Sequence, residues 1–553
     1  MVRTMFVNPF KTHHIDEFPD VHVPLDDTTH RSSLATHPRA SLTTSEKATK
    51  EDEAGGAALG RPESNASSGV VNHGMSVAAL KAEIDADVAA SDTDTPYDRT
   101  FYVAECMMGL TRIQGVALTL PQLSAEFGVS ETEVRYTTLS LFLGLCIGAS
   151  FWGTASDIIG RRLAFNFTLF LAGVFGLASG GGPNWIGTCA LYACIGLGVG
   201  GNLPVDGALF LEFLPQTSGN LLTLLSVFWP VVAWAFIPNF SCPTSTPAGQ
   251  CSKADNMGWR YLILTLGAIT FSMFIARFFL FHLYESPKFL LSRGRQAEAV
   301  ATVYGIAHYN RTHTWLTEDI LNQIGGNPDV TSEDVIKLSA IEIIKRSLSR
   351  FSMKRFKALF LDKKIGLTTA LLWFQWSTIG MAYPLFNAFL PQYLGSAAEI
   401  DTSTVYRNYA ISAIVGVPGS LIACYTVDLK YIGRKGTMAI ATVITGVFVF
   451  LFTISADSDF QLAFTCLEAF FQNIMYGVLY AYTPEVFPAP IRGTGTGMSS
   501  FLNRVAGLCA PIVAIQAGGS NPKAPIYASG GLFIAAFFSM LVLPIETRGM
   551  QTL

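Results

Sequence analysis

Long apolar segments recur along this chain from residue 101 onward, and short polar segments separate them. A helix needs about 20 mostly apolar residues to cross the hydrocarbon core of a bilayer. Glycine and proline lie inside several of these segments, as membrane-spanning helices tolerate. The pattern predicts an all-α membrane protein with twelve transmembrane helices, which are Phe101–Leu123, Tyr136–Ser156, Leu163–Gly182, Trp185–Asp206, Asn220–Phe240, Tyr261–Leu283, Ile365–Leu390, Asn408–Val427, Thr437–Ala456, Phe460–Tyr482, Thr494–Ala517 and Pro525–Ile545.

A short charged segment between the second and third spans has a counterpart in the second half of the chain. The first copy reads Gly-Thr-Ala-Ser-Asp-Ile-Ile-Gly-Arg-Arg over residues 153–162. The second copy reads Asp-Leu-Lys-Tyr-Ile-Gly-Arg-Lys over residues 428–435. Their glycines, Gly160 and Gly433, are 273 residues apart (433 minus 160). Two similar segments between membrane spans indicate an internal repeat.

Glutamates near the ends of spans support the same repeat. Glu212 and Glu485 follow spans four and ten, each within a Glu-x-x-Pro sequence, and they too are 273 residues apart (485 minus 212). Glu285 follows span six, and Glu546 follows span twelve. Parallel repeats about an axis normal to the membrane are the architecture of two-halved secondary transporters, which bind substrate between the halves. We therefore expect two six-helix bundles related by pseudo-two-fold symmetry.

Composition excludes several classes of function. The chain is 50% hydrophobic and 14% charged, whereas soluble proteins are roughly 25% charged. A net charge of −4 without a basic domain gives no indication of nucleic-acid binding. The nine cysteines are scattered and form no metal-binding spacing, so we expect no metal and no cofactor. No catalytic nucleophile constellation or P-loop appears, so we expect neither an enzyme nor a carrier powered by ATP.

The segments between the spans divide into a basic set and an acidic set. If all twelve spans cross, the basic segments lie on one side of the membrane, and the positive-inside rule places that side and both termini in the cytosol. We expect the protein in the plasma membrane. The basic residues of the short segments are Arg161, Arg162, Arg434, Lys435 and Arg492, and the acidic ones opposite are Glu126, Glu131, Glu133, Asp457 and Asp459.

Four regions follow from this pattern. Residues 1–98 are polar and lack an apolar period, which indicates a disordered cytosolic tail. Residues 99–283 form the first six-helix bundle and residues 365–553 the second. Residues 284–364 form a cytosolic loop with short amphipathic helices, one of them beginning at Pro287 after a Ser cap.

The sequence resembles the major facilitator superfamily over about residues 101–553. The resemblance rests on the repeated charged segment and on motifs typical of its sugar-porter subset. It extends to the fungal members of the branch related to synaptic-vesicle proteins. The motifs lie at residues 153–162, 200–215, 285–289, 476–488, 492–493 and 544–549. The resemblance implies a transporter with the twelve-helix fold, and the sugar-porter pattern places a Gln-rich face in span seven, which Gln375 matches loosely.

Two stretches depart from this family pattern. Relatives carry an aromatic-rich stretch with an Asp-Asn pair in span one, whereas residues 106–114 read Cys-Met-Met-Gly-Leu-Thr-Arg-Ile-Gln here. Span five is shorter than in relatives. Binding residues that the branch places in span one are therefore not expected in this chain.

Charged residues at the cytosolic ends of the spans are candidates for a gating network. Ion pairs between them would close the cytosolic side and break when the halves move; the alternative is solvated side chains that only set the topology. Each exposed pair contributes about 0–1 kcal/mol, but several together bias a two-state equilibrium. The candidates are Asp157, Arg161, Arg162, Glu212, Glu285, Asp428, Arg434, Lys435, Glu485, Arg492 and Glu546.

Polar residues inside the spans are candidates for binding a substrate or a proton. An ionised side chain in the bilayer centre costs about 2.5–3.5 kcal/mol, so it normally faces a cavity or a partner. Glu468 is the best candidate for a proton carrier, because burial disfavours the charged form of a carboxyl; the alternative is a structural pair with Arg504. The full set is Asn202, Asp206, Gln375, Tyr383, Asn387, Glu468, Asn473, Tyr476, Tyr480, Asn503 and Arg504.

Cys242 and Cys251 share one loop on the outer side. In an oxidising compartment they would form a disulfide; the alternative is two free thiols. We favour the disulfide.

The sequence as a whole predicts a monomeric secondary transporter in a lipid bilayer. Its substrate would be a small organic solute, and Arg504 is compatible with an organic acid while the sugar-porter motifs are compatible with a sugar. Proton symport is the favoured coupling. Facilitated diffusion, efflux and a non-transporting nutrient sensor are the alternatives.

Overall fold

The computed structural model describes most of the chain after residue 114. The described residues are 14–17, 115–159, 161–213, 228–243, 246–280, 285, 287–292, 295–310, 314, 316–319, 321, 357, 359–396, 401–427, 429, 432–455, 457–487, 489–518 and 521–547. Most of the predicted tail, the first part of span one and half of span five lie outside this set. The altered stretch 106–114 also lies outside it.

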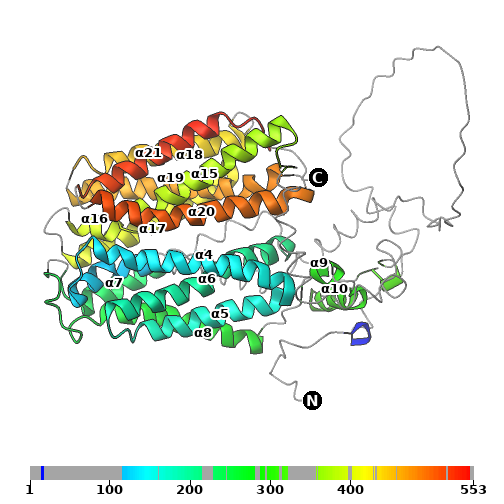
Figure 1. Cartoon of the computed structure of the whole chain (residues 1–553), viewed down its shortest axis with the longest axis horizontal. Coiled ribbons are helices and arrows are strands. Elements are labelled where there is room, and N and C mark those ends of the chain that lie inside the picture. The colour runs from blue at the N-terminus through cyan, green and yellow to red at the C-terminus, as the bar shows by residue number, and fades with distance from the viewer. Residues whose placement is uncertain are drawn as a thin grey trace, which may run out of the picture.

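Two bundles of helices make up the described fold, one from each half of the chain (Figure 1). The first half contributes the helix over residues 115–127, the 3₁₀ turn η2 (Glu133–Arg135), α4 (Tyr136–Ile159), α5 (Arg161–Ser179), α6 (Trp185–Phe213), α7 (Phe228–Phe240) and α8 (Gly258–Leu280). The second half contributes α15 (Lys363–Asn387), α16 (Leu390–Ser396), α17 (Thr402–Thr426), α18 (Gly433–Leu451), α19 (Ser458–Val486), α20 (Ala489–Gly518) and α21 (Ala524–Leu541). Each of the twelve predicted spans overlaps one of these helices, so the predicted all-α fold is confirmed.

Helix length and composition agree with a membrane location. Among the described residues, seven helices are long and apolar enough to cross a bilayer. The described apolar parts of α6 and α7 are shorter, at Trp185–Gly201 and Pro230–Phe240. Exposed large apolar side chains lie along the outside of both bundles, such as Phe151, Ile186 and Phe538. In a membrane these side chains face lipid, so their exposure is expected.

The two bundles use the same internal packing. In the first half, α4 and α5 both pack against α6, and α5 packs against α8. In the second half, α17 and α18 both pack against α19, and α18 packs against α21. The contacts between the bundles obey the same exchange, because α4 packs against α20 while α17 packs against α7. This reciprocity is the predicted pseudo-two-fold symmetry.

Glycines allow the closest of these contacts. A Cβ atom on Gly144 of α4 would overlap the carbonyl oxygen of Ala193 in α6, and one on Gly196 of α6 would overlap the carbonyl oxygen of Leu141. Gly148 and Gly200 repeat the contact one turn further along the same pair of helices. Small residues four apart let membrane helices approach at backbone distance. The α4–α6 pair is therefore a rigid element of the first bundle.

Several charged residues that were expected in loops lie inside helices. Arg162 is in the first turn of α5, and Arg434 and Lys435 are in the first turn of α18. Glu485 is in the last turn of α19. The same correction applies to the backbone positions of Asp157, Arg161, Glu212 and Arg492. The reason is that a helix continues as long as its backbone hydrogen bonds can form, whereas apolarity changes at the membrane surface.

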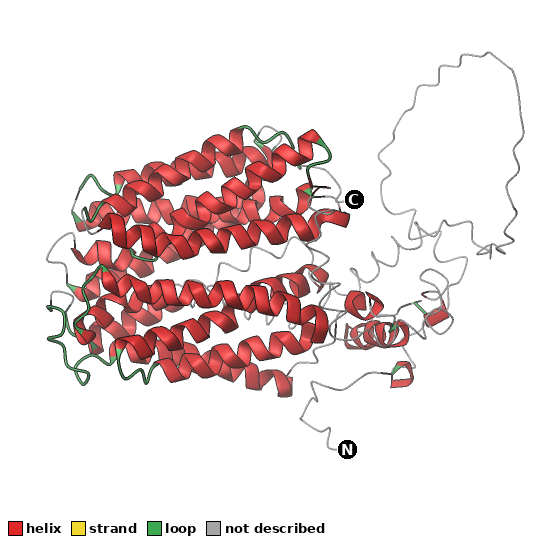
Figure 2. Ribbon diagram, viewed as in Figure 1, coloured by secondary structure: helices red, strands yellow, loops and turns green. Residues whose placement is uncertain are grey.

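The two ends of the bundles differ in character. The end where α5 and α18 begin carries the basic residues, and we call it the basic end. The opposite end carries the disulfide Cys242–Cys251, which the sequence predicted, and we call it the disulfide end. Two short helices, α9 (Pro287–Ser292) and α10 (Gln296–Asn310), lie beyond the basic end (Figures 1 and 2). α9 begins at Pro287, as predicted; the predicted capping sequence at residues 331–334 lies outside the described residues.

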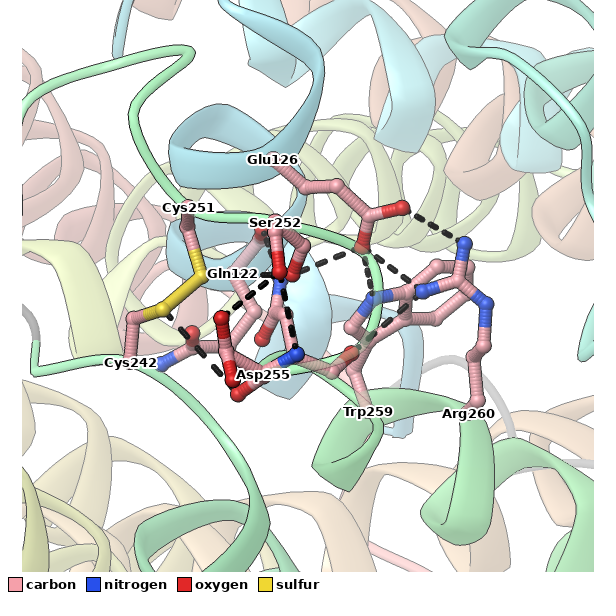
Figure 3. Close-up of a disulfide and its surroundings, with 9 residues drawn as sticks. Gln122, Glu126, Cys242, Cys251, Ser252, Asp255, Trp259 and Arg260 are labelled. Carbon is pink, nitrogen blue, oxygen red and sulfur yellow. Dashed lines mark hydrogen bonds and ion pairs between the residues drawn. A yellow bond between two sulfur atoms is a disulfide. The ribbon is translucent and has the colours of Figure 1, made fainter.

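A buried ion pair fastens the first bundle beside the disulfide (Figure 3). Glu126 accepts hydrogen bonds from the guanidinium of Arg260 at 2.6 and 2.7 Å, and also from Trp259 Nε1 at 3.0 Å. The side chains of Arg260 and Glu126 are 2% and 6% exposed. The backbone N–H groups of Gly249 and Cys251 donate to the carbonyl of Ala125. The disulfide loop is thereby held against the end of helix 115–127.

Candidate transport site

A carboxyl and two amides form a polar cluster inside the second bundle. Glu468 of α19 is 1% exposed. Its Oε1 accepts hydrogen bonds from Gln472 Nε2 at 2.6 Å and from Asn387 Nδ2 of α15 at 3.3 Å. Asn387 also donates to Gln472 Oε1 at 3.3 Å. Glu468 is thus a buried acid whose described hydrogen-bond partners are neutral.

Four aromatic rings form a row beside this cluster. Tyr383 meets Tyr476 edge to face with ring centroids 5.7 Å apart, and the rings of Tyr476 and Tyr480 are 6.2 Å apart. Trp376 meets Tyr480 edge to face at 4.9 Å. Trp376 is 4% exposed and donates its Nε1–H to Thr483 Oγ1 at 3.0 Å, whereas Tyr480 is 46% exposed. The ring of Tyr480 therefore presents a free face that Trp376 does not.

Arg504 lies where the second bundle meets the first. It is in α20, which packs against α4, and Cys146 Sγ of α4 donates to the Arg504 carbonyl oxygen at 3.5 Å. Arg504 Nη2 is buried without a hydrogen-bond partner among the described residues. The described ion pairs do not include one between Arg504 and Glu468. The alternative of a structural Glu468–Arg504 pair is therefore not what the described side chains form.

Gln375 is a second polar side chain without a described partner. It is fully buried in α15, one residue before Trp376. Neither Nε2 nor Oε1 of its amide has a hydrogen-bond partner among the described residues. An unsatisfied buried amide costs about 1–3 kcal/mol, so this position calls for a polar ligand group or water.

Two candidate asparagines belong to helix packing. Nδ2 of Asn473 lies 2.5 Å from where a Cβ on Gly416 of α17 would stand, and Asn503 lies directly against Gly380 of α15. These side chains fill the gap that a glycine leaves on the neighbouring helix. The side chains of Asn202 and Asp206 in α6 lie outside the described residues.

At the basic end, a glutamate caps the same helix in each half. Glu285 accepts the backbone N–H of Arg162 at 3.3 Å in the first turn of α5. Glu546 accepts the backbone N–H groups of Arg434 and Lys435, both at 3.1 Å, in the first turn of α18. A carboxylate there satisfies backbone donors and complements the helix dipole. The repeated glutamate after spans six and twelve is therefore a helix cap within its own bundle.

The cation of Arg434 completes the network in the second half. Its guanidinium forms an ion pair with Glu485 of α19 and donates to Thr547 Oγ1 at 3.3 Å. Lys435 Nζ donates to the carbonyl of Leu543 at 2.5 Å. These described contacts join helices of one bundle. The side chains of Asp157, Arg161, Glu212, Asp428 and Arg492 lie outside the described residues.

Sequence reasoning missed a residue that joins the two bundles. Arg135, at the disulfide end of α4, is 5% exposed. Its Nη1 donates to the carbonyl of Ala514 at 2.8 Å, and its guanidinium lies 5.0 Å from the ring centroid of Phe389 and 5.7 Å from that of Tyr393. The available signal was a single arginine in an otherwise acidic outer segment, against the positive-inside trend.

Other contacts also close the disulfide end. Tyr406 Oη of α17 donates to the Leu118 carbonyl at 2.8 Å, and Trp234 Nε1 of α7 donates to Ser403 Oγ at 3.3 Å. Each of these bonds crosses from one bundle to the other. The structure therefore represents a conformation that is closed at the disulfide end.

The family model of the Major Facilitator Superfamily matches residues 103–430 and 378–552. This chain belongs to the Major Facilitator Superfamily. As a member of this superfamily it is an integral membrane transport protein and not an enzyme. The match covers both bundles and agrees with the twelve-helix fold predicted from the sequence.

Relatives of this superfamily member include fungal transporters and synaptic-vesicle-related proteins. It is 44% identical to "MFS siderochrome iron transporter 1" of Ceriporiopsis subvermispora over 76% of this chain and 81% of that protein. It is 38% identical to "Major facilitator-type transporter hxnZ" of Emericella nidulans over 85% of this chain and 90% of that protein. It is 26% identical to the "Synaptic vesicle 2-related protein" of Xenopus laevis over 78% of this chain and 75% of that protein. The branch that the sequence motifs indicated is thus confirmed.

Solved structures show the same fold. The E. coli xylose transporter XylE, in a partially occluded inward-open conformation, aligns with a TM-score of 0.57 at 17% identity over 83% of this chain and 100% of that chain. The "proton:xylose symporter XylE" bound to 6-bromo-6-deoxy-D-glucose aligns with a TM-score of 0.58 at 18% identity over 82% and 97%. At these identities the likeness establishes the fold of this superfamily member.

Proposed function

We propose that this protein is a proton-coupled secondary transporter that moves a small organic solute, an organic acid or a sugar, by alternating access. The proposal unites the superfamily membership with the polar and aromatic side chains that α15, α19 and α20 bring together. Solute would bind beside the aromatic row, and the two bundles would rock about it. Protons and the solute would be the only small-molecule partners, and the monomer would be the working unit.

The environment of Glu468 is the observation that carries proton coupling. Its described hydrogen-bond donors, Asn387 and Gln472, are neutral amides. Such a site can hold the neutral acid, and it stabilises the carboxylate only through those two donors. A proton taken up there from one side would be released when the opposite side opens. The name of XylE as a proton:xylose symporter is consistent with this chemistry on the same fold.

The basic end would face the cytosol. Arg162, Arg434 and Lys435 lie at this end, and the positive-inside rule places such residues on the cytosolic side. The disulfide end would then face an oxidising exterior. This orientation places both termini in the cytosol and the protein in the plasma membrane. Residues 99–283 and 365–553 would be the moving bundles, with 284–364 as the cytosolic connection and 1–98 as the tail.

The cytosolic charges would act as a gating network through the helix ends that they hold. Glu546 and Glu485 bind the first turn of α18 from two other helices of the second bundle. Each bundle would therefore move as a unit at its cytosolic end. Contacts from the first bundle to this network would form only when the cytosolic side closes.

Uptake into reconstituted vesicles tests the proposal. The panel contains monosaccharides, organic acids and a ferric siderochrome, since one relative is named for that substrate. We expect accumulation of at least one solute with an inward proton gradient and equilibration without it. Glu468→Gln is expected to remove accumulation but to keep exchange of solute across the membrane. Asp459→Asn, an exposed position in the first turn of the same helix, is the matched control.

The alternatives predict other results. A facilitative carrier equilibrates solute equally with and without the gradient, and an efflux carrier accumulates only when the gradient is reversed. A non-transporting sensor binds a solute but moves none. Undiminished gradient-driven accumulation by Glu468→Gln would exclude this residue as the coupling site.

A further inference from the structure

Arg504 is a buried cation that the described structure leaves without an anion. Its Nη2 has no hydrogen-bond partner among the described residues, and no described carboxylate forms an ion pair with it. An ionised group inside a membrane protein normally faces a partner or a water-accessible cavity. The missing partner is therefore expected to come from outside the described helices.

The position of Arg504 matches that of a transported ligand. The residue lies on α20 where that helix contacts α4 of the other bundle, through the bond from Cys146 Sγ. An anion bound here would touch both moving bundles. The guanidinium also interacts electrostatically with Tyr480, the ring with 46% of its surface exposed. Cation and exposed ring are thus neighbours at the same interface.

The aromatic row fits the remainder of such a ligand. Tyr480 is in contact with Trp376 and Tyr476, so an apolar or planar group has rings to pack against at more than one level. The fully buried Gln375 precedes Trp376 and has both of its amide atoms unpaired among the described residues. A polar substituent of the ligand could satisfy that amide. A guanidinium, a row of rings and an unpaired amide together select a carboxylate joined to a flat body.

We propose that Arg504 binds the carboxylate of a small organic anion, a monocarboxylate whose ring packs on the Trp376–Tyr480–Tyr476 row. This inference rests on the proposed transport function and narrows its substrate to the organic acids. One carboxylate is specified because Arg504 is the single cation of this cluster in the described part of the chain, and Glu468 nearby in the bundle is an acid. A second carboxylate on the ligand would remain uncompensated.

Equilibrium binding to the purified full-length protein in lipid nanodiscs tests the inference without any gradient. Benzoate is the probe, benzamide is its neutral equivalent of the same shape, and phthalate carries a second carboxylate. We expect benzoate to bind at least about tenfold more tightly than benzamide or phthalate. Quenching of tryptophan fluorescence reports binding, because Trp376 lies in the row.

Variants locate the charge requirement. Arg504→Gln is expected to lower benzoate affinity by about tenfold or more and to leave benzamide affinity unchanged, which a merely structural role would not produce. Arg504→Lys is expected to retain part of the preference. Arg407→Gln, an exposed arginine of α17, is the matched control and keeps the wild-type preference.

Each outcome decides the inference. Equal affinity of the wild-type protein for benzoate and benzamide overturns it, and so does an unchanged preference in Arg504→Gln. If Arg504→Gln does not fold, the wild-type comparison and Arg504→Lys still decide. Binding is measured without a gradient, so a charge preference without proton-driven uptake would overturn the proposed coupling alone. Proton-driven uptake of a neutral sugar with no preference for benzoate would overturn the anion site alone.

Discussion

Arg135 and Gln392 join the two bundles at the disulfide end. Arg135 Nε of the first bundle donates to Gln392 Oε1 of the second at 3.1 Å, and Gln392 Nε2 donates back to the Glu131 carbonyl at 3.1 Å. The two residues therefore exchange bonds in both directions across the interface. A transporter that works by alternating access must break these bonds each time this end opens.

Removing the guanidinium is expected to favour opening of the disulfide end. Arg135→Met keeps an apolar side chain beside Phe389 but loses the bonds to Gln392 and Ala514. Hydrogen bonds from a charged group contribute about 1.5–3 kcal/mol each, and about 1.4 kcal/mol changes a population ratio tenfold. Cys146 lies 11 residues along α4, about 16 Å deeper. In cells carrying Cys146 as the only free cysteine, a membrane-impermeant maleimide should label it several-fold faster. Arg407→Met is the control, and unchanged labelling would contradict the latch.

Loss of the Arg434 cation is expected to impair transport more than stability. Arg434→Ala removes the ion pair with Glu485, whose side chains are 21% and 8% exposed. Glu485→Ala should lower the uptake rate similarly, and the double variant should be no worse than either single one. The control is Arg295→Ala, whose partner Glu298 lies on exposed α10 and whose ion pair contributes about 0–1 kcal/mol. Wild-type uptake rates in Arg434→Ala would refute the gating role.

Gly433 is expected to resist substitution for two reasons. Its φ of +62° lies in the left-handed region, where a side chain costs about 1–2 kcal/mol. A Cβ there would also stand 3.0 Å from the carboxyl of Glu546. Gly433→Ala should therefore lower the unfolding temperature in detergent. Gly531→Ala is the matched control, since a Cβ there meets nothing within 4 Å; its unfolding temperature should be unchanged or slightly higher. Equal effects of both substitutions would count against the cap.

Glu126 is expected to stabilise the first bundle only because Arg260 is present. Glu126→Gln leaves a buried guanidinium without its anion, which costs about 3–5 kcal/mol. The double change Glu126→Gln with Arg260→Met removes the charge as well and should recover most of the loss. Thermal unfolding of the two variants measures the difference. Glu298→Gln, which breaks an exposed pair, should change little. Equal unfolding temperatures of the single and double variants would show that the pair is not coupled.

Local sequence was sufficient for the helices and for their repetition. The start of α6 at Trp185 and the start of α19 at Ser458 are 273 residues apart (458 minus 185), as are their ends at Phe213 and Val486 (486 minus 213). The same separation had been read from Gly160 and Gly433. A membrane span is recognisable without tertiary information because its length must match the bilayer. The disulfide was likewise predictable, since its two cysteines share one short outer loop.

The membership of the candidate site was only partly predictable. Glu468, Asn387, Tyr383, Tyr476 and Tyr480 were chosen because polar and aromatic residues inside spans are unusual, and the fold brings them together in one cluster. Asn473 and Asn503 met the same criterion, but they pack against glycines of neighbouring helices. The sequence could not separate the two groups.

The sequence by itself therefore determined twelve helices, two copies of one bundle, and which ends carry charge. Only the tertiary structure decided that Glu285 and Glu546 cap helices of their own bundles, that Arg135 joins the bundles, and that Arg504 lies between them. The physical reason is the solvent. Lipid and protein interior are both apolar, so the sequence of a membrane helix does not reveal which face meets lipid and which meets another helix.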